Sequence, residues 1–206
     1  MCAGNLDTDG AIVQEMSTAL QSRLVHFELE VDSTTWLDWA MKNEVDHRIT
    51  DYIKFKPGDL YTFSPDHTDK TYACPRTWEF VSRLLPDMSE KDPDMLPILS
   101  GTLSEGVARE FVVFMKIYAS LPKISEIQLQ PMAVDIPKEP SILFALTGAL
   151  SHNMNVDTVE KVMKYVSRLP VEFQVVTLRE TVRRNKEMLS HPVIQKWIND
   201  SSAKLF

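Results

Sequence analysis

The sequence predicts a mainly α-helical fold with one or two short strands near its N-terminus. Glycine is scarce, with 6 residues against 12 prolines in 206, so a sheet-rich fold with many tight turns is disfavoured. The prolines lie mostly between apolar stretches, where proline starts or stops helices. Hydrophobic residues make up 44% of the chain and charged residues 25%, which is ordinary for a protein that buries a core.

Charge and hydropathy narrow the class of protein further. The net charge of -7 argues against a cationic binder of nucleic acid or of membrane surfaces. No apolar run approaches the roughly 20 residues that a membrane span needs, and the first residues lack the basic and apolar blocks of a secretory signal. The two cysteines, Cys2 and Cys74, suit a reducing compartment. We therefore expect a cytoplasmic protein.

The first elements expected are a short helix and a strand. Residues 11–22 favour a short helix, and residues 24–31 then alternate apolar and polar side chains. The alternation puts Val25, Phe27, Leu29 and Val31 on one face, which is typical of a half-buried strand.

Three helices are expected next. Asp32 is placed to cap a helix over 33–43. A second helix at about 45–55 ends before the Pro-Gly pair at 57–58. After an ordered loop, Pro75 fits the first position of a helix over 75–85.

The C-terminal part predicts a further set of helices. Residues 86–93 are acidic and indicate a connector, and the pattern Thr102-Leu103-Ser104-Glu105 matches a capping box that opens a helix to about residue 121. Residues 122–140 hold four prolines and indicate irregular chain with a short strand near 127–129. Four helices should follow, namely a buried one over 141–151, one capped by Asn155, and two at about 171–189 and 192–204.

The usual catalytic signatures do not occur in this sequence. There is no HExxH pattern, no paired CxxC and no Gly-Lys pair for a phosphate-binding P-loop. No acidic pair follows an apolar strand to hold magnesium and polarise water. The five histidines are scattered singly and are best interpreted as surface or structural residues. The chain is therefore not expected to hydrolyse a nucleotide by itself.

Three polar residues still suggest anion chemistry. Asn5 follows a short apolar start, and Arg23 lies between the expected short helix and the strand. Arg76 takes the second position of a proline-started helix, where free N–H groups favour anions and a guanidinium adds a phosphate clamp. The alternative is that both arginines pair with nearby carboxylates such as Glu79.

The order of these features resembles the C-terminal half of AAA+ ATPases of the MoxR-like type, found in bacteria and their phages. The resemblance covers essentially the whole chain. It is carried by Ala3-Gly4-Asn5, by MSTALQSRL at 16–24, by HFEL at 26–29, by WLDWA at 36–40, by PRTWE at 75–79, by GTLSEGVAREF at 101–111 and by RLPVEF at 168–173.

The resemblance implies a role for each of the three polar residues. Asn5 is similar to the sensor-one residue that orients the attacking water, and Arg23 to the arginine finger that reaches a neighbouring subunit's nucleotide. Arg76 is similar to the sensor-two arginine that touches phosphates from the lid. Residues 1–31 would be a remnant of the AAA+ core, 32–85 the helical lid and 86–206 a helical extension. ATP or ADP with Mg²⁺ is expected only in the complete ATPase, and no metal site is expected here.

The departure from the family is the missing P-loop and acidic magnesium site, so the chain is expected to be a C-terminal fragment. Its partner would be the missing half of the ATPase or a second copy of the chain paired through the strand. The intact protein would form a ring and would remodel a protein of unknown identity. The alternative is a helical protein-interaction module without a nucleotide role. In that case the basic group Arg179, Arg183, Arg184 and Lys186 would mark a solvated face or acidic partners.

Overall fold

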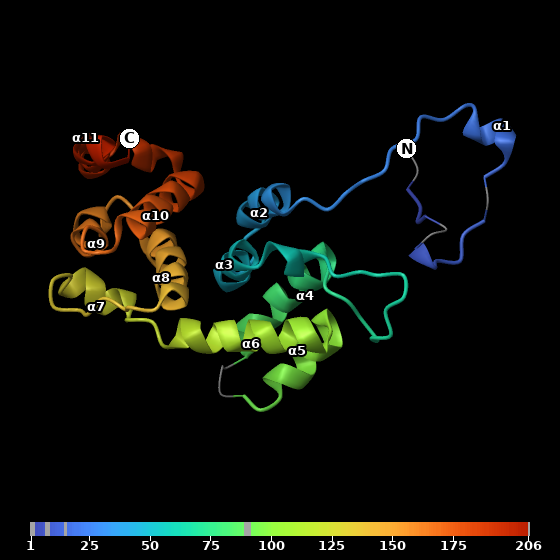
Figure 1. Cartoon of the computed structure of the whole chain (residues 1–206), viewed down its shortest axis with the longest axis horizontal. Coiled ribbons are helices and arrows are strands. Elements are labelled where there is room, and N and C mark those ends of the chain that lie inside the picture. The colour runs from blue at the N-terminus through green and yellow to red at the C-terminus, as the bar shows by residue number, and fades with distance from the viewer. Residues whose placement is uncertain (1–2, 7–8, 15, 89–91, 206) are drawn as a thin grey trace.

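The structure is a computed structural model that describes residues 3–6, 9–14, 16–88 and 92–205. Within these ranges it contains helices and connecting segments and no β-strand, which confirms the mainly α fold class. Figure 1 shows a helical body and an N-terminal segment that extends away from it. The helices are α1 (Thr18–Gln21), α2 (Ser33–Lys42), α3 (His47–Phe55), α4 (Pro75–Leu84), α5 (Met95–Leu103), α6 (Glu105–Ala119), α7 (Ile124–Leu129), α8 (Pro140–Asn153), α9 (Val159–Val166), α10 (Val171–Arg184) and α11 (Pro192–Leu205), with short 3-10 turns at Pro57–Leu60, Leu85–Asp87 and Lys186–Ser190.

The N-terminal expectations are corrected by the structure. Helix 11–22 shrinks to the single turn α1, and the predicted strand over 24–31 is irregular chain with every side chain exposed. A strand needs a neighbour for its backbone N–H and C=O groups, and no other described segment of this chain supplies one. Residues 24–31 therefore have the alternating sequence of a strand but lack, within the described ranges, the neighbouring strand with which they would form a sheet.

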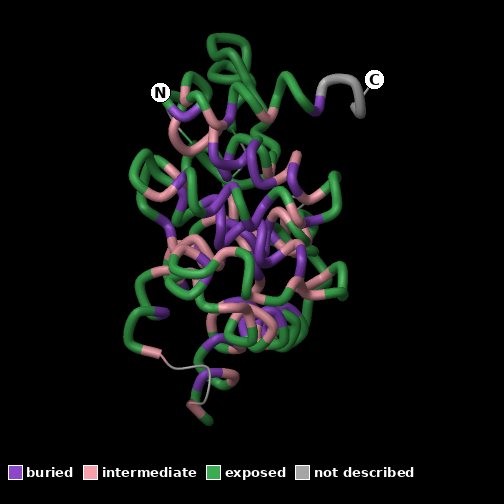
Figure 2. The backbone as a smooth tube through the Cα atoms, turned by 90° about the vertical axis from the view of Figure 1, so that its left-hand side faces the viewer, coloured by how far each residue is buried: buried purple, intermediate pink, exposed green. Residues whose placement is uncertain are grey.

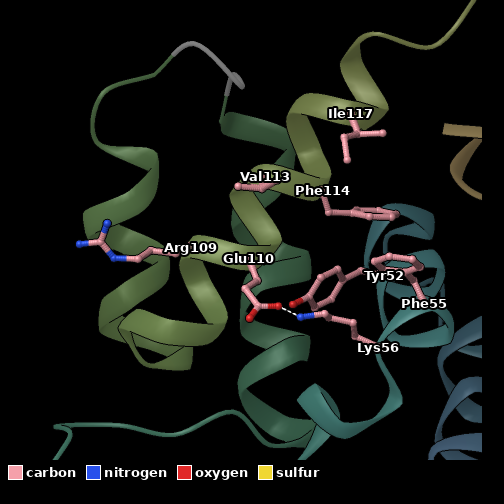
Figure 3. Close-up of a pocket in the computed structure, with 8 residues that line it drawn as sticks. All are labelled: Tyr52, Phe55, Lys56, Arg109, Glu110, Val113, Phe114 and Ile117. Carbon is pink, nitrogen blue, oxygen red and sulfur yellow. Dashed lines mark ion pairs between the residues drawn. The ribbon is translucent and has the colours of Figure 1, made fainter. Parts of the chain in front are cut away.

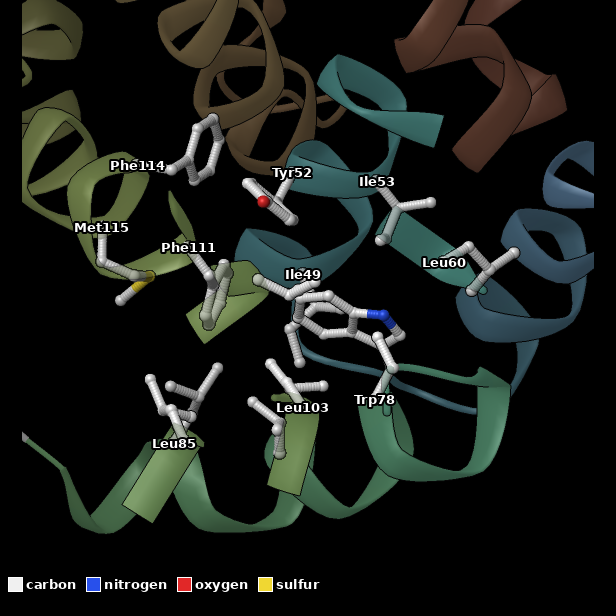
Figure 4. Close-up of a cluster of buried hydrophobic side chains, with 14 of the residues drawn as sticks. Ile49, Tyr52, Ile53, Leu60, Trp78, Leu85, Leu103, Phe111, Phe114 and Met115 are labelled. Carbon is white, nitrogen blue, oxygen red and sulfur yellow. The ribbon is translucent and has the colours of Figure 1, made fainter. Parts of the chain in front are cut away.

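The three helices predicted over 33–43, 45–55 and 75–85 are confirmed. The Asp32 side chain accepts a hydrogen bond from the backbone N–H of Thr35 (2.7 Å), which caps α2 as expected. Helix α3 ends before the Pro-Gly pair, and Pro75 begins α4. Trp78 of α4 is fully buried, and Figure 4 shows it beside Ile49 and Leu103 in the first hydrophobic core.

The expected capping box at 102–105 does not form. Thr102 lies inside α5, a helix that was not predicted, and its hydroxyl donates to the carbonyl of Ile98 (3.0 Å). Ser104 stands between α5 and α6 with a φ of 86° and makes no side-chain cap. The two helices fold back on each other at this residue, so α6 begins at Glu105 by a sharp turn instead of a capped entry.

The short strand expected near 127–129 is also wrong. Residues Ile124–Leu129 form helix α7, in which the N–H of Ile127 donates to the carbonyl of Lys123 (3.1 Å). Ile127 is fully buried, because α7 packs on α9. The apolar residue thus enters a core from a helix, although the prolines on both sides favoured irregular chain.

Helix α8 links two hydrophobic cores. The first is built mainly from α2 to α6 and extends from Trp36 to Met115, so it includes side chains from both sides of residue 86. The second is built from α7 to α11. Helix α8 gives Ala145 to the first core and Leu143, Leu146 and Leu150 to the second. This confirms the buried helix predicted over 141–151, and Figure 2 shows the buried stretches gathered in the middle of the body.

Candidate functional site

The N-terminal turn of α4 presents Arg76 to solvent. Pro75 takes the first helical position, and the Thr77 hydroxyl accepts from the backbone N–H of Cys74 (2.8 Å). This hydrogen bond stabilises the first turn of α4. Trp78 holds the same turn against the body of the protein, because its indole N–H donates to the carbonyl of Asp59 (2.9 Å). Arg76 is exposed and has no hydrogen bond or ion pair with any residue that the structure describes.

The pairing of Arg76 with Glu79, considered as the structural alternative, is not present. Glu79 instead forms an ion pair with Arg83, one turn further along α4. The first turn of α4 therefore places an unpaired guanidinium at the positive, N-terminal end of a helix, an arrangement that favours an anion.

Asn5 and Arg23 lie on the N-terminal segment and not on the helical body. Both are exposed, and Asn5 has no regular secondary structure. Arg23 folds back on α1 and donates from Nη1 to the carbonyl of Ala19 (2.6 Å). Figure 1 places α1 at the end of a long connection, away from α4. The structure therefore does not bring Asn5 and Arg23 together with Arg76.

A pocket of about 310 Å³ lies between α3 and α6 (Figure 3). Its floor is aromatic and aliphatic, and its mouth carries an ion pair between Lys56 and Glu110. The Tyr52 hydroxyl at the inner wall donates to the carboxylate of Asp59, and burial together with this bond raises the pKa of Tyr52 above its usual value. No local pattern in the amino-acid sequence predicts this pocket. Its other lining residues are Phe55, Arg109, Val113, Phe114 and Ile117.

A buried group of charges joins the two cores. Lys54 of α3 lies 2.6 Å from Glu180 of α10 and 3.5 Å from Asp51 of its own helix. Arg184 of α10 also approaches Asp51, with an N–O distance of 3.5 Å. Two carboxylates thus meet two cations across the junction of α3 and α10, and we refer to these four residues as the charged junction.

Asp51 is the centre of the charged junction. Its side chain is 1% exposed, and its Oδ2 has no hydrogen-bond donor among the described residues. Burial raises the pKa of Asp51 to about 6, against the opposing effect of Lys54 and Arg184. Gly148 of α8 makes room for this carboxylate, because a Cβ at that position would lie 2.2 Å from Oδ2.

Two histidines stack beside the charged junction. The rings of His47 in α3 and His152 in α8 are parallel within 8°, with centroids 4.2 Å apart, and Tyr118 of α6 packs edge-on against His47. Burial, reinforced by the neighbouring His152, lowers the pKa of His47 to about 4. Both histidines are therefore neutral at pH 7, which allows two rings to stack without repulsion.

Asp51 and His47 change stability with pH in opposite directions. The pKa of Asp51 is raised from 3.8 to about 6, so its contribution to stability is present below about pH 4 and lost as pH rises through about 6. The pKa of His47 is lowered from 6.5 to about 4, so its contribution is present above about pH 6.5 and lost as pH falls toward about 4.

We expect single substitutions to expose each contribution. Asp51→Asn should lose stability as the pH falls from about 6.5 to about 4, because the lowered pKa values of His47 and His152 are then no longer opposed by Asp51. His47→Gln should gain stability over the same range, because Asp51 remains. Urea unfolding midpoints of both variants and the unchanged chain at several pH values in this window measure the slopes. Slopes of equal sign in the two variants would contradict the assignment.

The chain matches no protein-family model, no curated protein and no solved structure. Among the residues that the structure describes, no group of three or more His, Cys, Asp or Glu side chains is arranged to hold a metal ion. No helix in the described ranges has both the length and the apolar character needed to cross a lipid bilayer. The function must therefore be argued from the residues themselves.

Proposed function

We propose that this chain is the C-terminal portion of a MoxR-like AAA+ ATPase and contributes the phosphate-contacting lid arginine, Arg76, to ATP-driven remodelling in the cytoplasm. The observation that carries the proposal is the exposed and unpaired state of Arg76 in the first turn of α4. A guanidinium in this position can bind two phosphate oxygens while the helix N-terminus adds positive potential.

A second observation supports the proposal. The apolar residues of 24–31 are exposed, as expected for a strand whose sheet belongs to a separate part of the ATPase. In that setting Asn5 would orient the attacking water, and Arg23 would reach the nucleotide of a neighbouring subunit. ATP supplies the phosphoryl group. Among the described residues of this chain, no group of three or more His, Cys, Asp or Glu side chains is arranged to bind Mg²⁺. The Mg²⁺ that accompanies ATP would be held in the complete ATPase.

The second candidate function is a helical protein-interaction module without a nucleotide role. The same exposed apolar segment favours it, because such a surface marks a contact with another protein. Within the basic group, Arg183 pairs with Asp38 and Arg184 with Asp51, so these two arginines are not free to bind an acidic partner.

Calorimetric titration with ADP and ATP tests the proposal against this alternative. We expect weak binding, with a Kd of about 100 µM to 1 mM, that is lost in Arg76→Ala. Arg83→Ala is the matched control, because Arg83 lies on the same helix, is also exposed and already pairs with Glu79. Equal loss in both variants, or no binding by the unchanged chain, would contradict a phosphate site on α4 and favour the interaction module.

A further inference from the structure

The segment 24–31 has an apolar face and two open backbone edges. Val25, Phe27 and Leu29 are 78%, 83% and 90% exposed. No hydrogen bond to the backbone of residues 24–31 occurs within the described part of the chain. We propose that this segment pairs antiparallel with the same segment of a second copy of this chain. The proposal does not depend on nucleotide binding.

The polar side chains of the segment are self-complementary in one antiparallel arrangement. When Phe27 lies opposite Phe27 of the second copy, Val25 lies opposite Leu29 twice, and the apolar faces coincide. On the other face, His26 then lies opposite Glu28 twice and Leu24 lies opposite Glu30 twice, so no carboxylate meets another. An imidazole N–H can donate a hydrogen bond to a carboxylate directly opposite it, whereas like charges directly opposite each other destabilise a strand pair.

Other arrangements of the same two segments are less favourable. A parallel, in-register pair places Glu28 opposite Glu28 and Glu30 opposite Glu30. An antiparallel pair shifted by two residues keeps the apolar face, but centred on Glu28 it opposes the two Glu28 carboxylates. Centred on His26, it opposes the two His26 rings and loses both His26–Glu28 pairs. A shift by one residue turns the apolar side chains of one copy to the polar face of the other. The charge pattern therefore selects the arrangement centred on Phe27.

Association should stop at two copies. A third strand would run in the same direction as the first, about 10 Å away from it. Because α2 begins at Ser33, directly after the segment, the helical bodies of the first and third copies would lie at the same end. A helix with its side chains is itself about 10–12 Å wide, so two such bodies would overlap. In the pair, the two bodies lie at opposite ends.

Sedimentation equilibrium of the full chain tests the dimer over about 10 µM to 1 mM, because a two-stranded pair is expected to be weak, with a Kd of about 100 µM. Phe27→Glu should raise the Kd by at least about tenfold. The matched control is Phe80→Glu, which changes another exposed phenylalanine, on α4, and should leave the Kd unchanged. A monomer throughout this range, or an equal effect of both substitutions, would overturn the proposal.

Cysteine cross-linking tests the arrangement of the two strands. In a chain with Cys2→Ser and Cys74→Ser, Phe27→Cys should form a disulfide-linked dimer, because directly opposed Cα atoms are about 4.5–5.5 Å apart. Val25→Cys should not, because in this arrangement the two copies of residue 25 are about 14 Å apart. Efficient cross-linking through residue 25 would indicate a parallel pair, and cross-linking through Glu28→Cys but not residue 27 would indicate the shifted pair. Either result overturns the proposed arrangement.

Discussion

Gly148→Ala is expected to lower the free energy of unfolding by about 3 kcal/mol. The new Cβ would lie 2.2 Å from Oδ2 and 2.5 Å from Cγ of Asp51. The aspartate side chain is short and fully buried, so it cannot move aside without leaving Lys54 and Arg184. The alternative is a shift of α8 against α3, which would open both hydrophobic cores.

Chemical unfolding of two further variants isolates the cause. In an Asp51→Ala background, Gly148→Ala should cost less than about 1 kcal/mol, because the carboxylate it meets is gone. Gly101→Ala in α5 is the control for the intrinsic preference of a helix for alanine, since its Cβ meets nothing within 4 Å. It should stabilise the chain by up to about 1 kcal/mol. A full cost of Gly148→Ala without the aspartate would contradict the close contact.

Lys54→Met is expected to lower the free energy of unfolding by about 3–5 kcal/mol. Lys54 lies within 4 Å of both carboxylates of the charged junction, and its loss leaves Glu180 and Asp51 buried with only Arg184 close to Asp51. The removal of one partner from a buried ion pair costs far more than the pair contributes, because the remaining charge is not solvated.

The control for Lys54→Met is Arg183→Met, which removes an ion pair between α10 and α2. Arg183 pairs with Asp38, whose side chain is 51% exposed, so solvent screens the pair and its loss should cost less than about 1 kcal/mol. Urea denaturation of the two variants compares the costs. Equal costs would mean that the charged junction is not the buried network that the distances indicate.

The predicted parts of the fold are those with local causes. The Asp32 cap and the first-turn proline of α4 act within a few residues, and both helices appear where the sequence predicts them. Residues 24–31 carry an equally clear local pattern, but a strand needs a partner that this chain does not supply from its described residues. Helix α5 was missed because Pro97 and Gly101 interrupt its apolar run and its N-cap residue, Asp94, makes no side-chain cap.

The charged junction could not have been predicted from the sequence. Lys54 and Glu180 are 126 residues apart, and Asp51 and Arg184 are 133 apart, so no local pattern links them. One residue did indicate a close contact on α8. Gly148 interrupts an apolar helix in which alanine would otherwise be preferred. The position of Arg76 in the first turn of α4 could be predicted, because it depends only on the adjacent Pro75, which begins the helix.

The most direct test of the proposed function is to locate the nucleotide on the chain. Amide and indole chemical shifts recorded during titration of the full chain with ADP would do this. The proposed function predicts the largest shifts in the first turn of α4, at Arg76, Thr77 and the indole N–H of Trp78, and predicts that Arg76→Ala removes them. Shifts confined to the pocket between α3 and α6, or no shifts, would contradict the assignment of α4 as the phosphate-contacting helix.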